Sequence, residues 1–362
     1  LSQDSTQKVV ANLSINKKKQ IEFSNLSVSD KNNKFDIKNV ILDQNLNVIN
    51  FDQISVKTNI DNKLNNEFTI QNKKKILIKG KVFDAKNLLK ELSRDNKKNT
   101  FLNKISKDIE VDFNRILKGT SFPINKFRLV GKIKKGSFEK ISAKSDFGEN
   151  EHIDISLKKR GNTGEKILEV YSDIAAPLLN DFKFFQGLEG GDLNFTSSFS
   201  DEISSSNLII NNFKLNKAPA LAKILSLADL KGLTDTLKGE GISFDTLSAK
   251  YNTNSSLMKI DEIFMIGPSI SILIDGYVEK KSGLVSLRGT LVPAKTLNSL
   301  IAKIPVVGDI LIGKKIGEGV FGISFKVKGL PNELKTTVNP IKTLTPRFIT
   351  RALENVKKKE LK

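Results

Sequence analysis

Apolar and polar residues alternate with a period of two along most of this chain. Ile54 and Val56, for example, alternate with Ser55 and Lys57. Side chains two positions apart on a β-strand point to the same side, so each such strand has one apolar and one polar face. The same alternation places apolar residues at Ile153, Ile155, Leu157, Leu193, Phe195, Phe199, Ile270, Ile272, Ile274, Val278, Val285, Leu287, Leu291, Phe321, Ile323, Phe325 and Val327. The pattern predicts a mainly β protein.

Turn signals favour hairpins between consecutive strands, as in an antiparallel meander. Lys281-Ser282-Gly283 and Glu189-Gly190-Gly191 are such signals. A sandwich of two sheets is the usual fold for one-sided strands. A long curled sheet with an apolar inner face fits equally well, because no Greek-key punctuation interrupts the strands and Phe residues accompany small positions such as Gly276 and Gly289.

A few short amphipathic helices interrupt the predicted sheet. After Pro219, an apolar stripe runs to Ala228, with Gly232 as the expected terminator. At the C-terminus, Thr345 and Pro346 fit the N-cap and first turn of a basic helix. The predicted helices cover residues 85–93, 99–108, 221–228, 297–304 and the segment that follows 345. Most of them are expected to cap sheet ends, whereas the last is equally suited to a membrane surface.

Composition excludes several kinds of chemistry. The chain has no Cys and a single His, His152, so disulfides, thiol nucleophiles and His clusters for a metal are absent. We expect His152 to be an ordinary surface residue of a strand. The net charge is +19, but Lys far outnumbers Arg and the lysine runs lack interleaved aromatics, which argues against a nucleic-acid partner. Anionic lipid headgroups remain a possible partner for such a basic surface.

No segment has the roughly 18 uninterrupted apolar residues of a spanning helix, and the first residues do not form a signal peptide. The chain opens on Leu1, so we expect an upstream part that carries any anchor or export signal. The acidic residues Asp245, Asp261, Glu262 and Glu318 have no spacing that defines a reaction. A GxGxxG at residues 317–322 leads into a strand and not into a helix, so turn glycines are the better interpretation. We therefore predict no enzyme activity, no cofactor and no metal site.

Three segments together resemble the C-terminal region of the AsmA-like proteins, in particular the large YhdP-type members. They read APALAKILSLADLKGLTDTLKGEGISFDTL, GTLVPAKTLNSLIAKIPVVGDILIGKKIGEGVFGISFKVKG and VNPIKTLTPRFI. Upstream, KGKVFDAKNLLKEL and YSDIAAPLLNDFKFFQGLEGGDLNFTSSF are similar to the segment that precedes this region. The resemblance divides the chain into β-strands at 1–72, a β-rich region at 73–215, the AsmA-like region at 216–351 and a basic tail at 352–362.

The resemblance implies an elongated, taco-shaped and open β-groove with an apolar lining, located in the periplasm of a Gram-negative bacterium and anchored upstream in the inner membrane. Such proteins are similar to bridge-like lipid transfer proteins, which carry phospholipids toward the outer membrane. The partners implied are phospholipid acyl chains, a membrane surface and envelope proteins.

The same hypothesis assigns roles to residues. Groove lining is expected from Leu193, Phe195, Phe199, Ile270, Ile272, Ile274, Val278, Val285, Leu287, Phe321, Ile323, Phe325 and Val327, and membrane-surface contact from Arg347, Phe348, Ile349, Arg351 and Leu353. Ser271, between two lining residues, is expected on the solvated outer face. The alternatives are a periplasmic assembly factor that binds a partner by strand addition at the sheet edge, and, less favoured, an envelope hydrolase.

Overall fold

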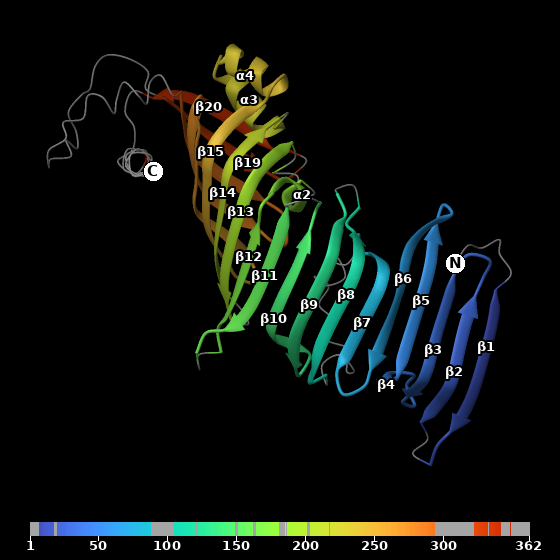
Figure 1. Cartoon of the computed structure of the whole chain (residues 1–362). Helices are drawn as coiled ribbons and strands as arrows, with labels where there is room; N and C mark the ends of the chain where they lie inside the picture. The colour runs from blue at the N-terminus through green and yellow to red at the C-terminus, as the bar shows by residue number, and fades with distance from the viewer. Residues whose placement is uncertain are drawn as a thin grey trace. The chain divides into compact units, whose positions relative to one another are not determined.

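The structure is a computed structural model that describes residues 7–17, 20–87, 105–119, 122–148, 151–161, 164–180, 185, 187–200, 203–216, 218–293, 322–331, 333–341 and 348. Its 20 strands belong to one sheet, accompanied by few helices (Figure 1). The prediction of a mainly β protein built on one long sheet is confirmed. The chain forms two compact units, residues 1–171 and 172–362, and the boundaries expected at 72 and 215 fall inside them.

The N-terminal unit is a run of strands that pair mostly with their neighbours in sequence. They are β1 (Lys8–Ile15), β2 (Ile21–Ser29), β3 (Lys34–Leu42), β4 (Val48–Asn50), β5 (Gln53–Ile60), β6 (Lys63–Asn72), β7 (Ile76–Asp84), β8 (Lys107–Leu117), β9 (Ile124–Lys134), β10 (Ser137–Asp146), β11 (His152–Lys159) and β12 (Lys166–Ser172). Pairing is antiparallel from β1 to β3, and β3 pairs with both the short β4 and β5. His152 is exposed at the start of β11, as expected of a surface residue.

One pair departs from the predicted meander, because β7 and β8 run parallel. A parallel pair requires a crossover connection, which residues 85–106 provide here. Ala85, Lys86 and Asn87 adopt no helix, and the rest of the helix expected at 85–93 lies outside the described residues. The end of the helix expected at 99–108 is wrong, since Lys107 and Asp108 begin β8. Ile109, Val111 and Phe113, which follow them at every second position, fit a strand better than a helix.

Aromatic side chains pack tightly across β6, β7 and β8. The ring of Phe113 stacks on Phe83 with 5.4 Å between centroids, and the edge of Phe68 meets both rings at 5.6 Å and 5.8 Å. Gly80 pairs with Phe68 on one side and Phe113 on the other. A Cβ at this position would lie 2.7 Å from Phe113 Cε1, so the cluster occupies the space that a side chain would need.

Gly80→Ala is therefore expected to destabilise the N-terminal unit by about 1–3 kcal/mol, the usual cost of overpacking. The added methyl would also lie 2.5 Å from the Glu67 carbonyl oxygen, which cannot move without disturbing the sheet. The denaturant midpoint measures the effect. Gly148→Ala is the matched control, because nothing lies within 4 Å of a Cβ there. Equal midpoints for the two variants would contradict the packing argument.

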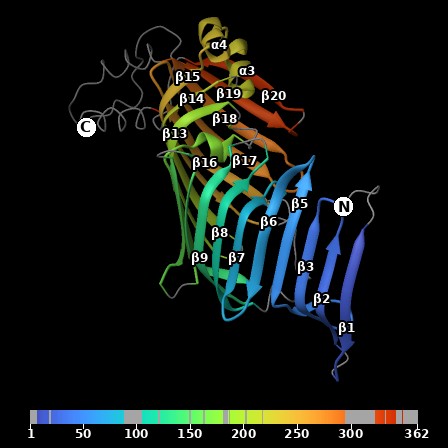
Figure 2. The ribbon, with the colours of Figure 1, turned by 45° about the vertical axis from the view of Figure 1, so that its right-hand side comes forward.

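Among the described residues, the C-terminal unit contains a curved antiparallel meander and short helices (Figures 1 and 2). Its elements are α2 (Ala176–Leu179), β13 (Leu188–Phe199), β14 (Ser204–Leu215), α3 (Pro219–Leu227), α4 (Lys231–Lys238), β15 (Ile242–Thr253), β16 (Leu257–Ile266), β17 (Ile270–Glu279), β18 (Val285–Pro293), β19 (Gly322–Gly329) and β20 (Lys335–Ile341). Pro219 is the first residue of α3, as its fixed φ favours. The helix predicted at 297–304 lies outside the described residues.

Two turn signals have other roles in this unit. Glu189-Gly190-Gly191 was expected to separate strands, but it lies inside β13, where both glycines have positive φ and Gly191 has no partner in the register. The dipeptide therefore makes an irregularity within a strand. Gly232 was expected to end the helix after Pro219, but that helix ends at Leu227 and Gly232 lies inside α4.

Helices α3 and α4 lie at the end of the sheet where β14 ends and β15 begins (Figure 1). Leu225 of α3 and Leu237 of α4 are fully buried. Helix α3 packs against α4 and β20, while α4 packs against β15. The apolar stripe predicted for residues 221–228 thus covers one end of the sheet, as expected for a capping helix.

Candidate functional site

The register of the C-terminal unit brings apolar residues from every strand to one face. Residues directly opposite each other in antiparallel strands share a face, so a chain of partners can be followed across the unit. The first row, nearest to the helices, consists of Leu193, Ile210, Leu247, Met265, Ile272, Leu291 and Ile323. The second row consists of Phe195, Leu208, Ala249, Ile263, Ile274, Gly289, Phe325 and Val338.

Two more rows follow toward the other end of the strands. The third row consists of Ser197, Ser206, Tyr251, Ile260, Gly276, Leu287, Val327 and Thr336. The fourth row consists of Phe199, Ser204, Thr253, Met258, Val278, Val285 and Gly329. Ile270 pairs with Pro293 and continues the same face of β17 beyond the first row. The predicted lining residues thus share one face, apart from Phe321, which lies outside the described residues.

Burial changes along this face. The first row is buried throughout, with exposed fractions from 0% at Ile210 to 7% at Ile323. Every residue of the fourth row is half-buried. The buried end is the one that carries α3 and α4, so the helices and the curvature of the sheet shield it from solvent. Leu193, Ile272 and Phe325 therefore have the burial of a core, and only the other end of the face is accessible.

The opposite face of the central strands is not solvated, contrary to expectation. Ser271 of β17 is 0% exposed, and its neighbours on that face, Leu273 and Val292, are also buried. The Ser271 hydroxyl has no hydrogen-bond partner among the described residues. Burial on both faces contradicts the one-sided pattern at this point, because the alternation Ile-Ser-Ile shows side-chain polarity and not what covers the strand.

Phe348 contributes to this covering. Its side chain is fully buried, and its ring meets the edge of Phe264 on β16 with 5.9 Å between centroids. This position conflicts with the expected membrane-surface contact of Phe348. Arg347, Ile349, Arg351 and Leu353, which were expected to share that role, lie outside the described residues.

The N-terminal unit has a second continuous apolar face. One residue from each of β1, β2, β3, β5, β6, β7, β8, β9, β10 and β11 takes part in a chain of cross-strand partners. This long row consists of Ala11, Leu26, Ile37, Ile54, Ile70, Ile78, Val111, Leu129, Ala143 and Ile155. Its members from Leu26 to Leu129 are half-buried. Four of these members, Ile70, Ile78, Val111 and Leu129, pack against a buried cluster of Ile76, Ile109 and Ile133.

The lining residues predicted individually from the sequence all lie in the C-terminal unit, although residues 1–72 were expected to continue the groove. The alternation at Ile54 and Val56 was the signal for it. What the pattern did not reveal was which of two similar apolar faces stays accessible, because that depends on where helices pack.

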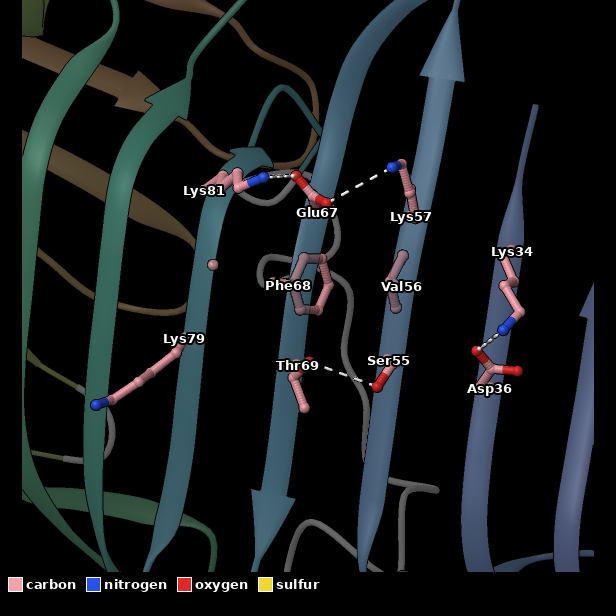
Figure 3. Close-up of a pocket in the computed structure, with 11 residues that line it drawn as sticks. Lys34, Asp36, Ser55, Val56, Lys57, Glu67, Phe68, Thr69, Lys79 and Lys81 are labelled. Atoms are coloured by element: carbon pink, nitrogen blue, oxygen red, sulfur yellow. Dashed lines mark hydrogen bonds and ion pairs between the residues drawn. The ribbon is translucent and has the colours of Figure 1, made fainter.

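The other face of the N-terminal unit is polar and holds an open depression of about 470 Å³ (Figure 3). Glu67 pairs with Lys57 at 3.6 Å and with Lys81 at 3.3 Å, and Lys34 pairs with Asp36 at 2.8 Å. The hydrogen bond that Lys34 donates helps to hold the pKa of the Asp36 carboxyl below its ordinary value, although desolvation opposes it. Such exposed pairs contribute about 0–1 kcal/mol each. The depression offers charges that are mostly compensated.

Acidic residues do not form a recognisable reaction centre in the part of the chain that the structure describes. Asp261 pairs with Lys259 at 2.9 Å, whereas the neighbouring Glu262 is buried. Within the described residues, no group of three His, Asp or Glu side chains could hold a metal ion. A search of the same residues found no helix long and apolar enough to cross a membrane.

The fold and these faces define a class of protein. It is a β-sheet protein in which paired apolar residues of neighbouring strands form a face that is buried at one end and half-buried at the other. Comparison of the chain with protein-family models, characterised proteins and solved structures found no match.

Proposed function

We propose that this chain transports phospholipid without catalysis, with acyl chains moving along the apolar face of the sheet. The observation that carries the proposal is the long row of the N-terminal unit, in which half-buried apolar residues follow one another from β2 to β9 without a polar interruption. The resemblance to AsmA-like proteins supports the same function, and with it a periplasmic location, an anchor in the inner membrane and an open groove.

Physical chemistry links such a face to lipid tails. Each CH₂ of an acyl chain that leaves a bilayer costs about 0.8 kcal/mol if it meets water. A passage between membranes must therefore offer continuous apolar contact while the headgroup stays hydrated. The sheet of the N-terminal unit suits both demands, because its long row is apolar and half-buried, and its opposite face carries ion pairs such as Lys57 with Glu67.

A charge in the long row tests the proposal. In Ile70→Asp, the carboxylate would lie where tails pass, and an unpaired charge in an apolar path costs several kcal/mol. We expect transfer of a fluorescent phospholipid from donor to acceptor vesicles to fall about tenfold or more. The matched control is Thr69→Asp, the adjacent residue on the polar face, whose cross-strand partner is Lys79.

Circular dichroism and thermal unfolding must show that both variants are folded. Wild-type transfer by a folded Ile70→Asp protein would contradict the conduit. Equal losses in both variants would also contradict it, because the polar face would then matter as much as the apolar one.

A second candidate function, partner binding by strand addition, is favoured by β1. Among the described strands β1 pairs only with β2, and its apolar residues Val9, Leu13 and Ile15 are 62%, 60% and 70% exposed. Free edges of this kind accept a further strand. Purification of the chain from membranes distinguishes the two functions, since a conduit retains lipid whereas an assembly factor retains a protein partner.

A further inference from the structure

Three hydroxyl groups interrupt the apolar face of the C-terminal unit at one level. Ser197, Ser206 and Tyr251 are successive members of the third row, contributed by β13, β14 and β15. The two serine Oγ atoms are 2.9 Å apart, and the Tyr251 hydroxyl is hydrogen-bonded to Ser206. Ser197 and Ser206 are only 6% and 7% exposed, so these hydroxyls have little access to water.

The three hydroxyl groups have one more O–H donor than the hydrogen bonds among them require. Each carries one O–H, and two hydrogen bonds join the three groups, so one O–H is left over. The leftover donor belongs to Ser197, Ser206 or Tyr251, depending on the direction of the two bonds. None of the three side chains has a further hydrogen-bond partner among the described residues. A buried donor without an acceptor costs about 1–3 kcal/mol, so the row is suited to a ligand that supplies an acceptor oxygen.

The surroundings indicate what that ligand carries besides the oxygen. The third row lies between the second row, whose members are partly buried and partly half-buried, and the half-buried fourth row. The fourth-row members next to the three hydroxyl residues are Phe199, Ser204 and Thr253, and the row continues as Met258, Val278 and Val285. Tyr251 itself is half-buried and pairs with Ile260. Burial raises the pKa of the Tyr251 hydroxyl, so this group stays a neutral donor at physiological pH. An acceptor oxygen attached to a hydrocarbon chain suits a neutral donor at the margin of an apolar face.

We propose that Ser197, Ser206 and Tyr251 form a hydrogen-bonding site for the ester carbonyl of a phospholipid acyl chain, whose hydrocarbon lies along the fourth row. This inference rests on the proposed function and adds a point at which the lipid is held. A carbonyl oxygen accepts the leftover O–H, which the hydrocarbon of a sliding tail cannot do. The row is thus a resting position on the path of the acyl chain.

The test compares two lipids that differ only at the carbonyl. A fluorescent phosphatidylcholine with two ester-linked chains is titrated into the full chain, and its diether analogue, which lacks both carbonyls, is titrated in parallel. Tyr251→Phe removes one donor with little change of shape. One neutral hydrogen bond contributes about 0.5–1.5 kcal/mol, so we expect the diester to bind two- to tenfold more weakly and the diether to be unaffected.

Ser198→Ala is the matched control, because Ser198 neighbours Ser197 on the opposite face of β13. We expect it to bind both lipids as the wild type does. Unchanged diester binding by Tyr251→Phe, or equal losses for diester and diether, would overturn the carbonyl site while leaving the conduit intact. Failure of the wild type to bind either lipid would overturn the proposed function as well.

Discussion

Ile272→Asp is expected to unfold the C-terminal unit, with a loss of more than about 4 kcal/mol of stability. Ile272 is 2% exposed and lies between Met265 and Leu291, which are buried as well. A carboxylate there would have no described cationic neighbour in the row. The denaturant midpoint measures the loss of stability, and hydrogen exchange of the β17 amides measures the local opening. The variant would stop transport by unfolding, so it cannot probe the conduit, which is why the half-buried Ile70 serves that purpose.

Ser271→Asp is expected to be almost as damaging, because Ser271 is 0% exposed. A solvated outer face would predict tolerance of this change, so the pair Ile272→Asp and Ser271→Asp tests whether both faces of β17 are buried in solution. Thr196→Asp on the exposed face of β13 is the control and should change stability by no more than about 0.5 kcal/mol. A stable Ser271→Asp protein would show that the outer face opens to water.

Phe113→Ala is expected to destabilise the N-terminal unit by about 3–5 kcal/mol, as large-to-small changes in a packed core do. Phe113 is 4% exposed and touches the rings of Phe68 and Phe83. Removing it opens a cavity at the parallel pairing of β7 with β8, where the sheet gains no support from a hairpin turn. Unfolding in denaturant measures the loss, and hydrogen exchange should show that β7 and β8 open first.

The control for this truncation is Phe122→Ala, because the Phe122 side chain is 70% exposed and the chemical change is identical. We expect the control to stay within about 0.5 kcal/mol of the wild type. Similar losses in both variants would mean that the aromatic cluster does not hold the parallel pair together.

Lipid binding and stability are expected to separate along the apolar faces. At the buried first row a charge lowers stability, whereas at the long row and the fourth row, which are half-buried, it acts on the ligand with a smaller cost to the fold. Tyr251 is half-buried and lies between the buried first row and the fourth row. Tyr251→Phe therefore tests the contact with the polar group of the lipid.

The alternation of apolar and polar residues was enough to predict the strands and the common face of residues such as Ile272, Phe325 and Val278. This works because side-chain direction in a strand depends only on position along the chain. The start of α3 at Pro219 was also predictable from the sequence, because the fixed φ of proline is a local property. The same local reasoning failed at Gly190 and Gly191, where a turn signal is used as an irregularity inside β13.

Only the tertiary structure decided which apolar residues are core and which are accessible. Ile272 and Ile54 have the same local pattern, yet Ile272 is buried in a unit whose end is covered by α3 and α4, whereas Ile54 is half-buried. The sequence also did not predict three further features. They are the parallel pairing of β7 with β8, the burial of both faces of β17 at Ser271 and Ile272, and the alignment of Ser197, Ser206 and Tyr251 across three strands. Each depends on contacts between different segments of the chain, and the alternation of apolar and polar residues does not show which segments make contact.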